Sequence, residues 1–197
     1  MTHIALISDS IFDNAAYTNG GPALIDHIRR LLPAHSTADL LARDGALISD
    51  VKAQLENLRP EHTQLVLSVG GNNALLNAGV LDLQVASSGE AYFHLETVVD
   101  EFEAAYRNLI EGCMQLNRPL CVCTIYEGSF DDLVYQKMVK LALRAFNNAI
   151  QMVAHDHCLP VIELRRVCTR AEDYANPIEP SVIGGEKIAR AILKTLL

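Results

Sequence analysis

The sequence has no tryptophan, and its few cysteines lack the spacing of a disulfide framework. The five cysteines are Cys113, Cys121, Cys123, Cys158 and Cys168. An odd, irregularly spaced set is typical of reduced and mostly buried thiols, which predicts a cytoplasmic protein. The first residues do not combine a positive segment with an apolar one, so we expect no signal peptide.

Long hydrophobic runs and clusters of positive charge are also missing. The longest apolar runs are far shorter than a membrane-spanning helix, which predicts no membrane span. The formal net charge is −8, and nucleic-acid-binding surfaces are basic. We therefore expect a protein that neither crosses a membrane nor binds nucleic acid.

The chain of 197 residues is half hydrophobic and one-fifth charged, as in ordinary globular proteins. This length predicts one domain over residues 1–197. Short apolar runs alternate with segments of helical periodicity, which predicts an α/β protein. Expected strands cover residues 4–7, 36–42, 64–69, 119–124 and 159–164. Expected helices cover 23–32, 50–58 capped by Ser49, 97–113 begun by Thr97 and Asp100, 131–153 capped by Asp131 or Asp132, and 182–196.

This alternation predicts a three-layer α/β/α sandwich with a parallel sheet of about five strands and right-handed crossovers. Residues 74–96 have no clear period, and we interpret them as an excursion above the sheet. Long excursions of this kind are often lids or binding loops. His94 lies in this segment, either as an exposed loop residue or as a base that reaches the site.

Three polar turns each follow a predicted strand and should meet at the carboxyl edge of the sheet, where open α/β sheets bind ligands. They contain Ser8-Asp9-Ser10, Gly45, and Gly70-Gly71-Asn72-Asn73. Ser10 is a candidate nucleophile, although Ser and Asp are also ordinary helix caps. Its backbone N–H, that of Gly45 and the Asn72 amide would suit an oxyanion, so the predicted chemistry is acyl transfer. The alternative for 70–73 is a plain tight turn.

The same blocks resemble those of the SGNH (GDSL-type) hydrolases. Ser8-Asp9-Ser10 is similar to that family's Gly-Asp-Ser block, and Gly45 falls where its second-block glycine stands. Residues 70–73 are similar to its Gly-x-Asn-Asp block. Residues 176–181 with Gly184 resemble its last block, Asp-x-x-His-Pro-Ser-x-x-Gly. The resemblance spans almost the whole chain and implies a flavodoxin-like sheet and hydrolysis of esters or acyl groups.

The last block departs from the family pattern, because Glu179 stands at the position of the catalytic histidine and Asn176 at that of its aspartate. Three hypotheses about the site follow. Glu179 could itself be the base for Ser10 if burial raised its pKa. His94 could supply the base, or the site could bind a ligand without turning it over.

We expect a hydrolase that acts on a small-molecule ester or acyl substrate. Ser10 is the nucleophile, Gly45 and Asn72 complete the oxyanion hole, and Glu179 is the atypical partner. The alternative is an inactive SGNH-fold protein that binds a small molecule or a partner. We expect no cofactor and no metal, since the His155-x-His157-Cys158 spacing is more typical of surface histidines. Substrate identity and oligomeric state stay open.

Overall fold

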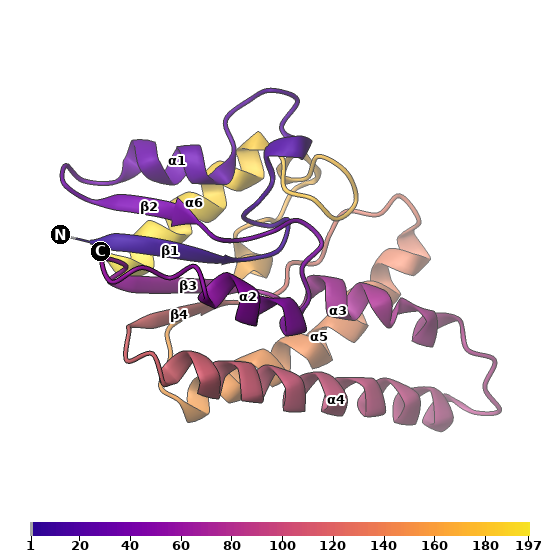
Figure 1. The fold of residues 1–197 in the computed structure, drawn as a ribbon. Coiled ribbons are helices and arrows are strands. Elements are labelled where there is room, and N and C mark those ends of the chain that lie inside the picture. Colours follow the sequence, from indigo (N-terminus) through magenta and orange to yellow (C-terminus); the bar gives the residue numbers. More distant parts are fainter. Residues whose placement is uncertain (1) are drawn as a thin grey trace.

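A computed structural model of the protein, which describes residues 2–197, contains a five-stranded, all-parallel sheet with strand order β2-β1-β3-β4-β5 (Figure 1). The strands are β1 (His3–Ser8), β2 (Thr37–Leu40), β3 (Gln64–Ser68), β4 (Leu120–Cys123) and β5 (Val161–Ile162). All five fall within the segments expected from the sequence or within one residue of them. In this order β1 and β3 are paired interior strands, so the turns that follow them lie side by side.

The central strands are apolar on both faces because helices cover both sides of the sheet. On β1, Ile4 and Leu6 belong to one buried cluster, and Ala5 and Ile7 belong to the other. A parallel sheet with two buried faces therefore explains why these strands appear as continuous apolar runs.

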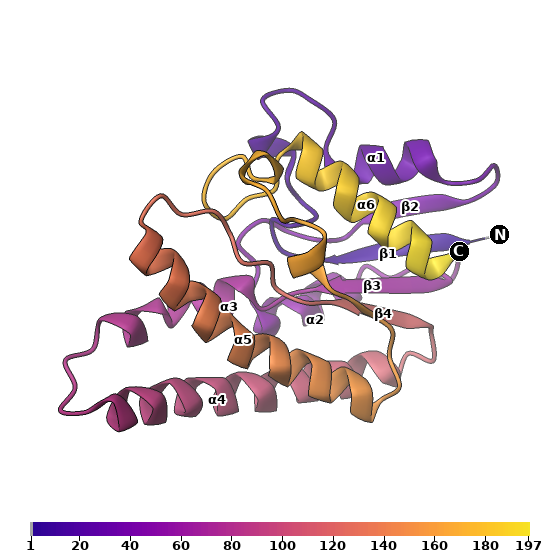
Figure 2. The same cartoon turned by 180° about the vertical axis from the view of Figure 1, so that it is seen from behind.

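Two helices pack on one face of the sheet, and three on the other (Figures 1 and 2). The first pair is α1 (Leu24–Leu31) and α6 (Val182–Leu196); the second group is α2 (Val51–Leu55), α4 (Ser88–Met114) and α5 (Leu133–Asp156). The fold is thus the predicted three-layer sandwich. Short helical turns complete it: α3 (Gly71–Leu76), η1 (Ala15–Tyr17), η2 (Ile48–Asp50), η3 (Ala78–Asp82), η4 (Leu164–Arg166) and η5 (Ala171–Asp173).

Two predicted helix starts are wrong. α4 begins at Ser88, nine residues before Thr97, and the Ser87 hydroxyl caps it by accepting from the Glu90 N–H. Thr97 lies inside this helix, where its hydroxyl donates to the Phe93 carbonyl. Ser49 lies within η2 and does not cap α2.

The segment 74–96 is more regular than expected, because it consists of the end of α3, η3 and the first turns of α4. Its period was obscured because many of its apolar side chains face solvent, among them Leu76, Tyr92 and Phe93. Among residues 2–197, no helix is both long and apolar enough to cross a membrane.

Candidate active site

Ser10 lies on the turn that follows β1, at the carboxyl edge of the sheet. The Asp9 backbone oxygen accepts hydrogen bonds from the N–H groups of Phe12 and Asp13, and the Asp9 Oδ1 accepts from the Ile11 N–H at 3.0 Å. These bonds hold Ser10 at the apex of a tight turn. Ser10 is 6% exposed, so its hydroxyl is in a largely dry environment.

The alternative in which Ser8, Asp9 and Ser10 cap the next helix is wrong. The next helical turn, η1, has Asn14 as its N-cap, and α1 has Ala23. The Ser8 hydroxyl instead donates to the Ser68 carbonyl across the sheet. This polar turn is therefore free of a capping role.

Glu179 reaches Ser10 from the loop before α6. The Ser10 hydroxyl donates to Glu179 Oε1 at 3.0 Å, which confirms that the two side chains lie within hydrogen-bond reach. The Asn176 Oδ1 accepts from the N–H groups of Ile178 and Glu179, forming a turn that brings Glu179 inward. Asn176 itself is exposed. It organises the backbone, and its position in the family block does not make it a partner of Ser10.

The environment of Glu179 changes its acidity. Burial raises the pKa of this carboxyl from 4.5 to about 7, the hydrogen bond from Ser10 opposes part of that rise, and the negative charges of Asp44 and Asp9 add to it. Its second oxygen, Oε2, is buried and has no hydrogen-bond partner within residues 2–197. Glu179 thus has the proton affinity of a general base that works near neutral pH.

Asp9 is a second buried carboxyl beside Ser10. Burial raises its pKa to about 6, while the hydrogen bonds from the Ile11 N–H and the Ser8 hydroxyl lower it in part. Both Asp9 and Glu179 line the same pocket. Two carboxyls in one apolar site repel each other when ionised, so each favours the protonated form of the other.

Gly45 lies in the loop after β2 with a φ of +77°, a conformation that favours glycine. Two contacts tie this loop to the Ser10 segment: Asp13 Oδ2 accepts from the Asp44 N–H at 3.1 Å, and the Tyr17 hydroxyl donates to Asp44 at 2.7 Å. Within residues 2–197, neither the Gly45 nor the Ser10 backbone N–H has a hydrogen-bond partner. Both donors are therefore available to a ligand, although Gly45 is exposed and does not itself line the pocket.

Asn72, at the start of α3, lines the Ser10 pocket. One of its amide hydrogens is used, because Nδ2 donates to the Ala46 carbonyl at 3.0 Å. The other remains for a ligand, since an amide group has two. Asn73 has a structural role, accepting from the Ile48 N–H at 3.1 Å. The turn at 70–73 thus also fastens the loop that contains Gly45.

The structure places His94 outside this pocket. His94 lies on α4, with its Nε2 atom 3.9 Å from the Glu90 carboxylate, and lines a separate depression with Gly79 and Thr97. Among the described residues that line the Ser10 pocket there is no histidine at all. Of the two candidate bases, Glu179 and His94, the fold therefore brings only Glu179 to Ser10.

Sequence reasoning missed the segment after β4. The Tyr126 hydroxyl donates to the Ile178 carbonyl at 2.5 Å, and the Ser129 N–H donates to the Pro177 carbonyl at 2.8 Å. These bonds hold the loop that carries Glu179. The signal was available, because Tyr126 follows a predicted strand at the same carboxyl edge as Ser10.

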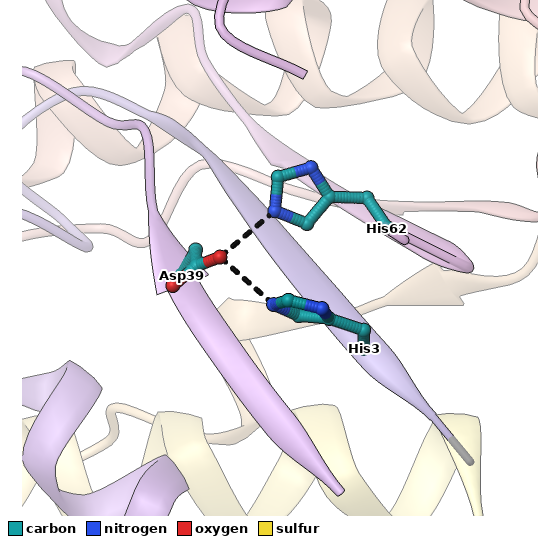
Figure 3. A group of neighbouring side chains, drawn as sticks. All are labelled: His3, Asp39 and His62. Carbon is teal, nitrogen blue, oxygen red and sulfur yellow. Dashed lines mark hydrogen bonds and ion pairs between the residues drawn. The ribbon is translucent and has the colours of Figure 1, made fainter. Parts of the chain in front are cut away.

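A second polar cluster lies at the opposite, amino edge of the sheet (Figure 3). His3 Nε2 and His62 Nε2 contact the same Asp39 oxygen, at 2.8 and 2.9 Å. Within residues 2–197, these three side chains are the one group spaced to hold a metal ion, which the sequence did not predict. His155 and His157 are not part of it.

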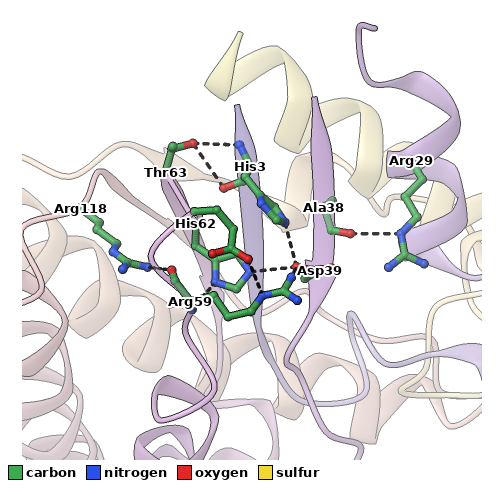
Figure 4. A network of polar contacts seen from close by, with 9 residues as sticks. His3, Arg29, Ala38, Asp39, Arg59, His62, Thr63 and Arg118 are labelled. Carbon is green, nitrogen blue, oxygen red and sulfur yellow. Dashed lines mark hydrogen bonds and ion pairs between the residues drawn. The ribbon is translucent and has the colours of Figure 1, made fainter. Parts of the chain in front are cut away.

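The hydrogen bonds of this cluster do not fit a metal site. His62 Nδ1 accepts from the Arg59 backbone N–H at 2.9 Å, so a neutral His62 carries its proton on Nε2, the atom that would have to bind the metal. The Arg59 guanidinium also pairs with the same Asp39 oxygen (Figure 4). A cation and two donors already satisfy this carboxylate, so the cluster joins β1, β2 and the loop before β3.

Comparison with known proteins finds similarity to solved structures only. No protein-family profile and no curated protein matches the chain. A lipase from a goat rumen metagenome superposes with a TM-score of 0.76 at 13% identity, covering 99% of this chain and 97% of the other. A lipase/acylhydrolase from Enterococcus faecalis gives 0.71 at 19% identity, with 98% and 94% covered. An acetyl xylan esterase gives 0.70 at 18% identity, with 99% and 100% covered. The chain therefore has the fold of the SGNH-type hydrolases, as its sequence blocks implied.

Proposed function

We propose that this protein is a serine esterase or acylhydrolase in which Glu179 replaces the usual histidine. The observation that carries the proposal is the 3.0 Å hydrogen bond from the Ser10 hydroxyl to a buried Glu179 whose pKa is raised to about 7. An ordinary exposed glutamate is too weak a base at neutral pH. Burial raises the pKa of Glu179 and so makes it a stronger base. The fold shared with lipases and esterases supports the same reaction class.

The first step of the proposed reaction moves one proton from the Ser10 hydroxyl to the Glu179 carboxylate. Ionised Glu179 accepts the Ser10 proton at Oε1 while the Ser10 oxygen attacks the substrate carbonyl carbon. The protonated Glu179 then gives this proton to the departing alcohol as the carbonyl–oxygen bond breaks, leaving an acyl group on Ser10. Water completes the cycle. Glu179 takes a proton from water while the water oxygen bonds to the acyl carbon; the bond from that carbon to the Ser10 oxygen then breaks, Glu179 returns the proton to Ser10, and the carboxylic acid leaves.

The negative oxygen of the tetrahedral intermediate needs fixed donors. The N–H of Ser10 and the remaining amide hydrogen of Asn72 are the proposed donors in the pocket, and the Gly45 N–H, in the neighbouring loop, is proposed as a third. The turn at Asp9 and the bond from Asn72 to the Ala46 carbonyl hold the Ser10 and Asn72 donors in place before substrate binds. Glu179 Oε2 is left for the leaving group or the attacking water.

A site that binds without turnover is the second candidate, and the absence of histidine from the described pocket favours it. A fluorophosphonate probe separates the two, because covalent labelling requires Ser10 to displace fluoride. We expect labelling at Ser10, none in Ser10→Ala, and strong slowing in Glu179→Gln. An exposed control, Ser88→Ala, should label like the wild type. A folded protein that is never labelled and hydrolyses no ester would favour the binding site.

We also propose that the protein works in the cytoplasm. All five cysteines are free thiols, and four of them are buried. Reduced thiols are typical of reducing compartments. Localisation of the tagged full-length chain by fractionation tests this, and recovery in the medium or periplasm would contradict it.

A further inference from the structure

The pocket that contains Ser10 extends beyond the reacting groups. One of its walls is α5. Five side chains of this helix line the pocket at intervals of one, three or four residues: Tyr135, Val139, Ala142, Leu143 and Phe146. That spacing puts them on one face of the helix. At 1.5 Å per residue the stripe is about 16 Å long.

The opposite wall comes from α3 and η3. Its side chains are small or aliphatic: Ala74, Leu75, Ala78, Val80 and Leu81. Ile125, after β4, also lines the pocket. The pocket therefore continues from the Ser10 hydroxyl as an apolar channel between two helical segments, one of which belongs to the excursion at 74–96.

Apart from the hydroxyl of the half-buried Tyr135, the polar side chains of this channel lie close to Ser10 or have a hydrogen-bond or ion-pair partner. Asp9 and Glu179 belong to the site, and Glu127 forms an ion pair with Lys140 at 2.7 Å. The Tyr126 hydroxyl donates to the Ile178 carbonyl, and the Asn77 amide donates to the Asn73 carbonyl at 2.9 Å. No Lys, Arg or His is among the described lining residues.

These properties favour one of three kinds of ester substrate. An acetylated sugar presents many hydroxyl groups, and each would lose its hydrogen bonds to water against aliphatic walls. An anionic head group would meet carboxylates and no cation. An aliphatic chain meets neither penalty, and its transfer from water into this channel is favourable.

We propose that the α5 channel binds the hydrocarbon chain of the acyl group, so that the protein prefers esters of medium-chain fatty acids over acetyl esters. This inference rests on the proposed function only for its kinetic part, because the channel can bind a chain whether or not Ser10 reacts. Ala142 lines the channel together with Val139 and Phe146, so a larger side chain at this position should narrow it. Each buried methylene should raise kcat/KM by about fourfold, which corresponds to ~0.8 kcal/mol.

Two measurements test the proposal independently. The first is kcat/KM for nitrophenyl acetate, butyrate, octanoate and dodecanoate with the wild-type protein. The second is calorimetric binding of methyl octanoate to Ser10→Ala, which cannot form an acyl-enzyme. We expect kcat/KM to rise from acetate to octanoate, and methyl octanoate to bind where methyl acetate does not.

Ala142→Phe should fill the channel, lowering the octanoate-to-acetate ratio of kcat/KM at least tenfold and abolishing binding of methyl octanoate in the Ser10→Ala background. The matched control is Leu141→Phe, the adjacent position on α5, which is 52% exposed and outside the channel. It should change neither result. If Ala142→Phe does not fold, Val139→Phe makes the same test at a half-buried position one turn away.

The outcomes distinguish the channel from the chemistry. Binding of methyl octanoate without turnover of any ester by the wild type would support the channel and overturn the proposed function. Turnover with an acetate preference and no binding would overturn the channel and leave the proposed function standing. Loss of binding in Leu141→Phe as well as Ala142→Phe would also overturn the channel.

Discussion

The Tyr126 hydroxyl donates a 2.5 Å hydrogen bond to the carbonyl of Ile178, the residue immediately before Glu179. Tyr126 is buried in the segment that follows β4, so this bond connects the carboxyl edge of the sheet to the loop that carries the proposed base. The position of Glu179 therefore depends on a residue from a different part of the chain.

We expect Tyr126→Phe to lower kcat several-fold with little change in KM, because the ring still fills its place while the Glu179 loop loses an anchor. A neutral hydrogen bond of this kind contributes about 1 kcal/mol to stability. A looser, more hydrated Glu179 should also move the pH midpoint of kcat/KM downward. A loss of stability with an unchanged midpoint would show that Tyr126 is only structural.

The pH dependence of activity should follow Glu179. The base must be ionised, so kcat/KM should rise with pH through a midpoint near 7. Asp44→Asn removes a negative charge that raises this pKa, and should shift the midpoint to lower pH. Asp100→Asn, an exposed change on α4, serves as the control. The same midpoint in both variants would contradict the assignment of Glu179 as the base.

Glu179→Gln should stabilise the folded protein above neutral pH while abolishing turnover. A carboxyl whose pKa is raised on folding binds more protons when folded, so wild-type stability falls as pH rises from about 4.5 to about 7. The variant lacks this loss. We expect its free energy of unfolding to exceed that of the wild type by about 1–2 kcal/mol at pH 8, and this difference to vanish below pH 4. Denaturant unfolding at several pH values measures it; equal stability at pH 8 would contradict the raised pKa.

Asn72→Ala should reduce ester turnover about 10²- to 10³-fold, the effect of losing one oxyanion donor. It should also cost about 1 kcal/mol of stability, because the bond to the Ala46 carbonyl is lost. Asn73→Ala is the matched comparison, since it breaks the bond to Ile48 but lines no part of the pocket. Equal loss of turnover in both variants would mean that Asn72 acts through the loop alone.

Asp39→Asn should destabilise the fold by about 1–3 kcal/mol and leave kcat unchanged, because the His3–Asp39–His62 cluster lies at the far edge of the sheet. Its histidines and Arg59 lower the pKa of Asp39 despite the opposing effect of burial. Its contribution is therefore present above the unfolded-state value and is lost as pH falls below it. Equal acid sensitivity of the variant and the wild type would contradict this.

A parallel sheet with the turns of Ser10, Gly45 and Asn72 at one edge could be predicted from the sequence, and the resemblance to the SGNH hydrolases added Glu179. Apolar runs that alternate with helical periodicity leave few arrangements other than a parallel sheet, and every such strand ends at the same edge. The start of α4 could not be predicted, because Tyr92 and Phe93 are exposed in its first turns. These apolar side chains on the solvent side hide the helical period of the sequence. Local capping signals at Ser87 and Thr97 were equally good.

What the sequence determined by itself was the chemistry that Ser10 and Glu179 have available. Whether Glu179 is basic enough to use was decided by tertiary structure, because a pKa depends on burial and nearby charge, and both come from residues distant in sequence. The same holds for His94, which shares a segment with the pocket wall but faces elsewhere. The α5 channel could not be predicted either. In the sequence, the stripe from Tyr135 to Phe146 is equally consistent with an ordinary buried helix face. Only the tertiary structure shows that a pocket lies between this stripe and the residues of α3 and η3.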